Sequence, residues 1–365
     1  MLIRDQIRAR DLPPLLPDAE PTVENWEKRR EELKTILLRE EYGFLPDPPL
    51  KWEVEEPNPA GFSCAGNAME HHPVMHLTLS DGTPFSFPFH FTMPTKGLPC
   101  PAVLHVNFRN AVPDRYMPVE ELVDHGFAVF SFCYNDVTSD NGDFTDKLAG
   151  VFYKGRDRNP TDPGKISLWS WAAQRICDYM MTLPELDKSR FAVAGHSRLG
   201  KTALLSGALD PRFTYVISNC AGCSGDSPMR GKVPGNERVR HIVDRFPYWF
   251  CPNYAKYVDN ESAGEFDQHD LLALTAPRFL LIGSAAEDAW ADQIGQYQSA
   301  VAAGDAWRIY GVDPGLPEDV ILDRPTEFNS GAIGFHFREG RHFFSRADWG
   351  AYMRFIEKHP ASPKN

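Results

Sequence analysis

Residues 195–202 combine a serine and a lysine with two glycines in an order that could support two different chemistries. The stretch reads G-H-S-R-L-G-K-T. It satisfies the phosphate-loop pattern G-x-x-x-x-G-K-[ST], in which Lys201 would hold a nucleotide phosphate. It also places Ser197 in a glycine-flanked turn after an apolar run. That is the arrangement of a nucleophile elbow, where the serine attacks an ester or amide carbonyl.

The phosphate-loop interpretation finds less support in the rest of the chain. The variable positions of such a loop are normally small, because backbone N–H groups must approach the phosphate. Here they are His196, Ser197, Arg198 and Leu199. The loop also needs a carboxylate at the end of another strand to hold Mg²⁺. Glu287 and Asp288 follow a later strand and could serve. A P-loop nucleotide-binding protein is therefore kept as an alternative, beside a carbohydrate binder without catalytic activity.

The nucleophile-elbow interpretation accounts for more of the chain. In hydrolases of this kind the acid and the histidine follow the serine in that order, each at the carboxyl end of a later strand. Asp288 and His342 both follow apolar runs that predict such strands. Ser197 would be the nucleophile, His342 the base and Asp288 the carboxylate that orients the imidazole. His336 competes for the role of base, but it lies inside an alternating strand.

Arg198 directly follows the predicted nucleophile. Its N–H would lie at a helix N-terminus, where the helix dipole favours negative charge. Its guanidinium could donate charge-assisted hydrogen bonds to a tetrahedral intermediate. The motif departs from G-x-S-x-G, because Leu199 is the second residue after the serine and Gly200 the third. We therefore expect Arg198 to help bind the oxyanion and the turn to accept a side chain at Leu199.

The elements that must position these residues alternate between strands and helices. Apolar runs predict strands over residues 101–106, 127–132, 191–194, 215–218, 278–283 and 333–337. Helices are expected over residues 120–125, 166–183, 199–209 and 348–357. This alternation indicates a mostly parallel sheet covered by helices on both faces. We therefore predict an α/β protein with the three-layer α/β-hydrolase fold.

The N-terminal part of the chain differs in composition from the rest. Residues 11–21 contain four prolines and residues 46–60 contain five, which predicts two extended segments. We expect residues 1–70 to wrap the main body without folding independently. Residues 71–365 are then the catalytic domain, in which residues 223–270 form an insertion of the kind that often carries function.

Composition limits the classes of partner. The net charge of −12 argues against a nucleic-acid partner, and no apolar run approaches the length of a membrane span. The seven cysteines cannot all pair within one chain, which suggests reduced thiols. No histidine or cysteine cluster has convincing metal-ligand spacing, so neither a metal nor a cofactor is expected. The oligomeric state is open.

Several stretches in the second half of the chain resemble one known family. They are GHSRLGK (195–201), FPYWF (246–250), DQHDLLAL (267–274), APR (276–278), EDAWAD (287–292) and residues 342–349. In this order they resemble the glucuronoyl esterases of carbohydrate esterase family fifteen, particularly the bacterial members. The resemblance covers most of residues 75–358.

The resemblance implies a serine esterase without metal or cofactor. Its substrate would be an oligosaccharide ester, most specifically the 4-O-methyl-glucuronoyl ester that links xylan to lignin alcohols. An acetylxylan or other carbohydrate esterase is the nearest alternative. The family pattern implies Ser197 as nucleophile, His342 as base and Arg198 as support for the oxyanion. The residues implied to contact the glucuronate are Lys201, Glu237 and Trp290.

Two features depart from the family pattern. Many members carry the acid after the strand that follows the elbow, but residues 218–226 contain no carboxylate before Asp226. Asp288 is therefore the expected acid, with Glu287 and Asp226 as alternatives. Lignin-active enzymes are also normally exported, whereas the opening residues MLIRDQIRARDLPP lack the apolar core of a signal peptide. We expect a cytoplasmic enzyme, or a secreted one if a leader precedes this sequence.

Overall fold

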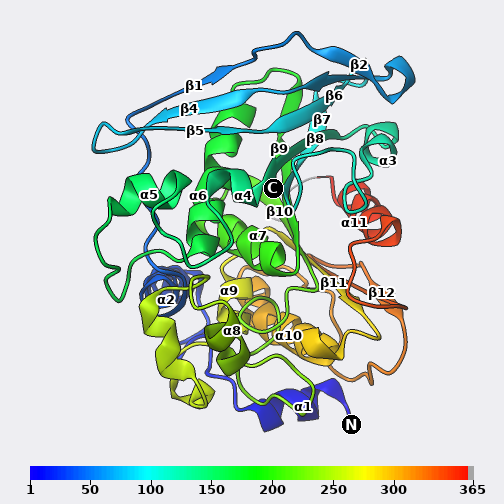
Figure 1. Cartoon of the computed structure of the whole chain (residues 1–365). Helices are drawn as coiled ribbons and strands as arrows, with labels where there is room; N and C mark the ends of the chain where they lie inside the picture. The colour runs from blue at the N-terminus through cyan, green and yellow to red at the C-terminus, as the bar shows by residue number, and fades with distance from the viewer. Residues whose placement is uncertain (361–365) are drawn as a thin grey trace.

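A ten-stranded sheet lies at the centre of the computed structural model, which describes residues 1–360 (Figure 1). The strand order is β12-β13-β11-β10-β9-β7-β8-β6-β3-β2. The strands are β2 (Gly61–Ser63), β3 (Ala68–His71), β6 (His90–Pro94), β7 (Cys100–Asn107), β8 (Ala128–Cys133), β9 (Leu186–His196), β10 (Phe213–Asn219), β11 (Phe279–Ala285), β12 (Thr326–Phe328) and β13 (Ile333–Arg338). The six from β13 to β8 run parallel, and the remaining pairings are antiparallel.

Helices cover both faces of this sheet. One layer contains α6 (Lys165–Met180), α7 (Arg198–Leu209), α9 (Gln268–Ala273) and α10 (Gln293–Ile309), which pack on one another and on the central strands. The other contains α3 (Val119–Asp124) and α11 (Arg346–Lys358), which are joined by the ion pairs Arg346–Glu121 and His125–Glu357. Shorter helices are α4 (Tyr134–Val137), α5 (Lys147–Tyr153) and α8 (Val239–Arg245). The predicted three-layer α/β-hydrolase fold is confirmed.

The sheet order brings distant parts of the sequence to one edge. Strands β9, β10, β11 and β13 are parallel neighbours, so their carboxyl ends lie side by side. Asn219, the last residue of β10, pairs with His196 on one side and Gly283 on the other. The residues that immediately follow these strands therefore share one end of the molecule, as ligands and active sites do in open α/β sheets.

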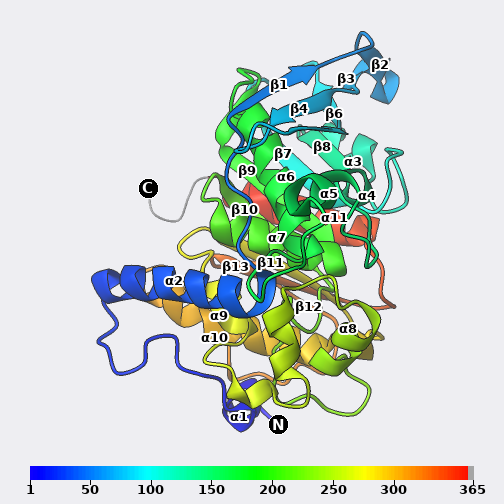
Figure 2. The same cartoon turned by 60° about the vertical axis from the view of Figure 1, so that its left-hand side comes forward.

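The N-terminal residues are built into the sheets rather than only wrapped around them. β2 is an edge strand of the central sheet, and β3 lies between β2 and β6. β1 (Lys51–Glu55) forms a second, three-stranded sheet with β4 (Val74–Thr78) and β5 (Pro84–Pro88), seen at the top of Figures 1 and 2. The expected boundary at residue 70 thus cuts across strand pairing. The alternation K-W-E-V-E of β1 explains why this proline-flanked segment forms a strand.

Two buried ionisable groups connect the N-terminal helices to the main body. Arg10, at the end of α1 (Ile3–Arg10), donates to both carboxylate oxygens of Asp292, at 3.2 and 3.1 Å. Glu41 lies in a π-helical turn after α2 (Val23–Leu37), and its carboxyl oxygens accept from the side-chain amide of Gln268 at 3.1 Å. Burial raises the pKa of Glu41 to about 8, so this carboxyl group is mostly protonated at neutral pH.

The helices of residues 1–360 are all too short or too polar to cross a bilayer.

Replacing Glu41 by glutamine should change how stability depends on pH. The folded state keeps the Glu41 proton up to about pH 8, whereas the unfolded chain loses it near pH 4.5. Because the folded state binds more protons in this window, this group lowers the free energy of unfolding as the pH rises. The loss is on the order of a few kcal/mol, since one pKa unit corresponds to about 1.4 kcal/mol. The glutamine of Glu41→Gln cannot ionise, so the variant should not show this loss of stability as the pH rises.

Urea unfolding at about pH 5 and about pH 8.5 measures this difference. The stability of Glu41→Gln relative to wild type should rise between the two conditions. Glu32→Gln, which changes an exposed glutamate of α2, should show no such rise. Parallel pH profiles for wild type and Glu41→Gln would contradict a buried, protonated Glu41.

Candidate active site

Ser197 occupies a one-residue turn between the end of β9 and the start of α7. Its backbone has φ 58° and ψ −129°, a conformation that L-residues rarely adopt. The turn is possible because its neighbours are small: a Cβ on Gly195 would lie 2.0 Å from the Leu199 carbonyl oxygen. A Cβ on Gly200 would lie 3.0 to 3.2 Å from Ala221, Ser218 and the Gly195 carbonyl oxygen. The second glycine of the motif is therefore needed at the third position, where α7 crosses the end of β10.

This turn does not support the phosphate-loop alternative. A phosphate loop needs several residues between strand and helix to surround the anion with N–H groups. Here His196 ends the strand and Arg198 begins the helix. Lys201 is buried, and its ammonium group donates to the backbone oxygens of Ala221 and Cys223, the latter at 2.6 Å. The lysine is thus held by protein groups, and the predicted elbow describes this stretch.

His342 and Asp288 form a hydrogen-bonded pair at the same edge of the sheet. His342 Nδ1 lies 2.6 Å from Asp288 Oδ2. The Asp288 side chain is 4% exposed and that of His342 is 39% exposed, so the imidazole faces the open side. The His342 ring also lies 4.5 Å from the ring of His196, the residue next to Ser197. The predicted histidine and carboxylate therefore meet beside the nucleophile elbow.

His196 itself is a neutral supporting residue. Its Nδ1 lies 2.7 Å from Asn219 Oδ1, while the Asn219 amide nitrogen donates to the Tyr352 hydroxyl at 3.0 Å. Burial, and then the proximity of His342, holds the pKa of His196 well below its ordinary value. The neutral ring donates through Nδ1 and presents an uncharged surface to His342.

The loop that carries His342 is held by Arg338 at the end of β13. The Arg338 guanidinium donates to both oxygens of Asp348, at 2.9 Å each, and Asp348 also caps α11. It donates in addition to backbone oxygens of three loop residues, Glu339, Arg341 and Phe343. One buried ion pair therefore fixes the turn on both sides of the histidine.

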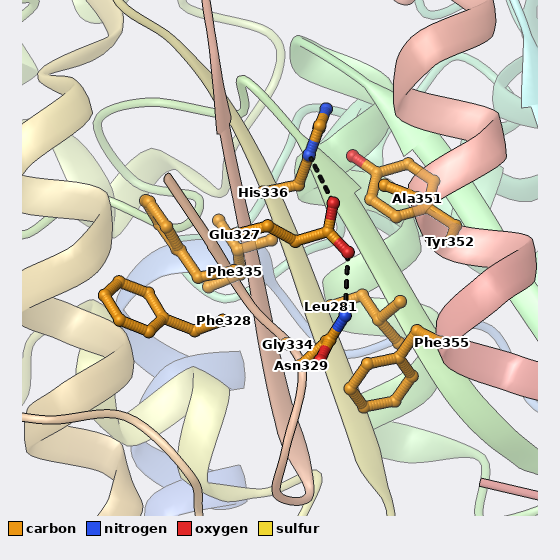
Figure 3. Close-up of a pocket in the computed structure, with 11 residues that line it drawn as sticks. Leu281, Glu327, Phe328, Asn329, Gly334, Phe335, His336, Ala351, Tyr352 and Phe355 are labelled. Atoms are coloured by element: carbon orange, nitrogen blue, oxygen red, sulfur yellow. Dashed lines mark hydrogen bonds and ion pairs between the residues drawn. The ribbon is translucent and has the colours of Figure 1, made fainter. Parts of the chain in front are cut away.

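The other candidate acids and the other candidate base lie elsewhere. Asp226 is fully buried and accepts from Ser218 and from the backbone N–H groups that follow β10. Glu287 is exposed and pairs with Arg341 at 3.4 Å. His336 lies in β13 between Glu327 and Asp348, next to a separate cavity of about 10 Å³ (Figure 3). Among the three carboxylates considered, Asp288 is the one hydrogen-bonded to His342.

Arg198 is held in place by an acidic residue and an aromatic stack. Its guanidinium pairs with the Asp140 carboxylate and lies 4.7 Å from the Trp249 ring and 5.2 Å from the Phe246 ring. Asp140 also accepts from the Trp249 indole at 2.8 Å and the Tyr134 hydroxyl at 3.0 Å. Arg198 Nε has no hydrogen-bond partner within residues 1–360. The ion pair and the aromatic stack therefore hold the guanidinium in one orientation beside Ser197.

Lys201, Glu237 and Trp290 form a connected group that lines the same cavity as Ser197. Lys201 Nζ lies 3.6 Å from a Glu237 carboxylate oxygen, and the Trp290 indole donates to the other oxygen at 3.3 Å. Trp290 is 39% exposed, and the His241 ring packs 4.8 Å from it. Together they offer a carboxylate and a flat aromatic face to a ligand, with the buried ammonium of Lys201 beside the carboxylate.

These groups line one cavity of about 360 Å³. All seven residues expected from the sequence to act in catalysis or sugar binding lie on its wall: Ser197, Arg198, Lys201, Glu237, Asp288, Trp290 and His342. The structure adds Phe246 and Trp249 from the predicted insertion, and Asp140 behind Arg198. The stretch D-N-G-D at residues 140–143 looks like an ordinary turn in the sequence, and nothing there signals a contact with Arg198.

Comparison with known proteins agrees with this arrangement. Residues 78–311 match the family model described as "Glucuronyl esterase, fungi". The chain belongs to the glucuronyl esterase family. The resemblance expected from its sequence motifs is thereby confirmed.

Similar members of the family come from bacteria and fungi. The carbohydrate esterase MZ0003 of an unknown prokaryotic organism is 36% identical over 66% of this chain and 55% of its own length. The 4-O-methyl-glucuronoyl methylesterase 1 of Wolfiporia cocos is 28% identical over 79% of this chain and 68% of its own length. The structure of a glucuronoyl esterase from Solibacter usitatus superposes with a TM-score of 0.84 at 27% identity, over 95% of this chain and 97% of that one. The chain thus spans little more than half of MZ0003.

Substitutions at Arg198 and Asp140 should show that the two residues act together. Arg198→Ala should lower kcat for ester hydrolysis by about 10²- to 10³-fold, the usual cost of losing an oxyanion donor. Asp140→Asn should lower kcat by about tenfold, because the guanidinium loses its charged partner. In the double variant the Asp140 change should cost nothing further, and a double-mutant cycle of kcat measures this.

Asp143→Asn is the matched control, because Asp143 lies in the same turn but bonds to Thr145. Asp143→Asn should leave kcat unchanged, both alone and combined with Arg198→Ala. Strictly additive effects of Arg198→Ala and Asp140→Asn would contradict a shared role.

Proposed function

We propose that the chain is a serine esterase that hydrolyses esters of 4-O-methyl-glucuronate carried by xylan-type saccharides. The observation that carries the proposal is the Asp288–His342 hydrogen bond on the wall of the cavity that Ser197 also lines. Relatives named 4-O-methyl-glucuronoyl methylesterases support the choice of substrate. The sugar-sized cavity with its charged pair and exposed tryptophan supports it independently.

The first half of the reaction transfers the acyl group to Ser197. The serine oxygen attacks the ester carbonyl carbon while its proton passes to His342. Asp288 accepts the Nδ1 hydrogen bond and stabilises the imidazolium that forms. Negative charge on the former carbonyl oxygen is stabilised by the Arg198 backbone N–H and guanidinium. The carbon–oxygen bond to the alcohol then breaks, and His342 returns the proton to the leaving alcohol.

The second half of the reaction releases the acid. Water enters the place of the alcohol, gives a proton to His342 and attacks the acyl-enzyme. The new tetrahedral intermediate uses the same oxyanion contacts, and its collapse returns the proton to Ser197. The products are a glucuronate and the free enzyme.

The sugar half of the substrate fits the group formed by Lys201, Glu237 and Trp290. The Glu237 carboxylate can accept hydrogen bonds from sugar hydroxyls, while the Lys201 ammonium, which already donates to the Ala221 and Cys223 carbonyls, lies beside it and offsets its charge. The exposed face of Trp290 suits the apolar C–H face of a pyranose ring. An acetyl group would reach none of these residues and would leave most of the cavity filled with water. The arrangement therefore favours a large, hydroxylated acyl group over acetate.

Asp288→Asn should lower kcat by about 10³- to 10⁴-fold with little change in KM. The amide would donate to Nδ1 and hold the imidazole in the tautomer that cannot take the serine proton. Glu287→Gln is the matched control, because this exposed neighbour lies outside the hydrogen-bonded pair. Steady-state kinetics on a glucuronate ester measures both. Equal losses in the two variants, or full activity of Asp288→Asn, would argue against Asp288 as the acid.

Substrate choice is tested by comparing a benzyl glucuronate ester with an aryl acetate. We expect kcat/KM to favour the glucuronate ester, and Trp290→Ala to raise its KM about tenfold, equivalent to about 1.4 kcal/mol. Acetate hydrolysis should be insensitive to Trp290→Ala, because acetate does not reach that ring. Trp52→Ala removes an exposed tryptophan of β1 and serves as control.

Ser197→Ala should abolish both activities and the covalent labelling by a fluorophosphonate probe. Faster turnover of the acetate, with no effect of Trp290→Ala on either substrate, would favour the acetyl-esterase alternative. A protein that neither labels nor hydrolyses either ester would refute the esterase proposal itself.

A further inference from the structure

Cys220 is a cavity-wall residue for which the esterase mechanism has no use. It is the first residue after β10, and its backbone N–H donates to the Gly283 carbonyl at 2.8 Å. Its side chain is 1% exposed but lines the same cavity as Ser197. Parallel neighbours β10 and β11 bring it beside Asp288, which follows β11.

The Cys220 sulfur lies close to the two groups that form the hydrogen-bonded pair. One ligand atom each from Cys220, Asp288 and His342 all lie within 4.8 Å of one another. Within residues 1–360 this is the one group of three or more such side chains arranged tightly enough to hold a metal ion. Thiolate, imidazole and carboxylate are the ligands that Zn²⁺ takes in proteins.

The geometry is near to what a tetrahedral ion requires. Metal–ligand bonds of about 2.0 to 2.3 Å place neighbouring ligand atoms about 3.5 Å apart. The three ligand atoms, which lie within 4.8 Å of one another, would have to adjust to this spacing, and the 2.6 Å hydrogen bond between Asp288 and His342 would have to open. The cavity provides both a path for the ion and space for water as the fourth ligand. The loop carrying His342 and the backbone hydrogen bond of Cys220 hold two of the ligands near these positions.

Charge also favours a divalent ion here. Binding would release the thiol proton to solvent and form a metal–sulfur bond, while the imidazole stays neutral. One thiolate, one carboxylate and one M²⁺ then sum to zero charge, which lowers the cost of burying the ion.

We propose that Cys220, Asp288 and His342 form a binding site for a thiophilic divalent cation such as Zn²⁺, and that occupation of this site switches off the esterase. Binding takes His342 away from both Asp288 and the serine proton, so catalysis and metal binding exclude each other. The inhibitory consequence rests on the proposed esterase function. The binding itself does not.

The test uses the full chain after treatment with a chelator, titrated with Cd²⁺ and with Zn²⁺. Cadmium–thiolate bonds absorb in the near ultraviolet, so Cd²⁺ reports sulfur coordination directly. We expect one thiolate-bound Cd²⁺ per chain in wild type and none in Cys220→Ser. Cys64→Ser removes the half-buried cysteine, which lies far along the sequence from the site, and should retain the band.

Inhibition is measured with Zn²⁺, each variant relative to its own metal-free rate. Half-inhibition of Cys220→Ser should need more than about 100-fold more Zn²⁺ than wild type, because loss of a direct ligand costs more than loss of an outer partner. Mg²⁺, which prefers oxygen ligands, should not inhibit wild type. If Cys220→Ser has no esterase activity, the cadmium absorption band decides whether the metal site exists. Zn²⁺ inhibition is then measured on Cys220→Ala instead.

Two results would overturn the proposal. Equal Zn²⁺ inhibition of wild type and Cys220→Ser would place the ion on His342 and Asp288 alone. Absence of a Cys220-dependent cadmium band would remove the site altogether. A band without any esterase activity in the metal-free protein would uphold the site and refute the proposed function instead.

Discussion

The strained turn at Ser197 is the constraint on which the rest of the site depends. A non-glycine residue at positive φ costs on the order of 1–3 kcal/mol and persists only where its surroundings impose it. Here β9 and α7 are fixed on either side, and the Ser197 N–H donates to the Asn219 carbonyl of β10 at 2.8 Å. The strain places the serine at the end of the sheet and at the start of α7. Loss of the packing that holds the turn would remove the nucleophile and the oxyanion contacts together.

Charge around this turn is balanced by pairs of different kinds. Arg198 is paired with Asp140 and Lys201 with Glu237, so two cations flank the serine without leaving a bare positive charge. The histidine before the serine is kept neutral by burial. The proposed esterase would have to stabilise an oxyanion only while it exists. Pre-oriented but neutralised cations suit that task better than a strongly positive pocket, which would retain an acidic product.

Much of the site could be predicted from the sequence because the topology of a parallel sheet orders it. Residues after consecutive strands reach the same edge, so the chain order of Ser197, Asp288 and His342 predicted their meeting without any knowledge of distance. Asp140 could not be found in this way. It precedes Arg198 by more than fifty residues, and a turn of polar residues has no periodicity that reveals its contact. The choice of Asp288 over Glu287 was likewise left open, because adjacent carboxylates have the same relation to the strand.

The fold likewise contains segments that an apolar pattern in the sequence predicts and segments that have no such pattern. Central strands and α6 are marked by apolar runs, whereas α10 is buried on nearly all sides and its sequence shows little contrast between faces. The sequence-based boundary was set at residue 70 because prolines on either side of β1 predicted an extended segment. In the structure those prolines flank a strand that completes a second sheet. The proline-rich composition correctly predicted an extended backbone around β1, but it could not show that β1 pairs with β4.

The contact between Arg10 and Asp292 has a consequence for how the catalytic unit is delimited. Asp292 is buried four residues beyond Asp288, and its negative charge is shared between Arg10 and Lys232. A fragment trimmed to the sheet would look complete, with every catalytic side chain present. It would nevertheless leave that carboxylate with half of its counter-charge, next to the segment that sets the tautomer of His342. The first ten residues are therefore remote in sequence but pack as part of the unit that holds the candidate active site, and engineered fusions should leave α1 free to dock.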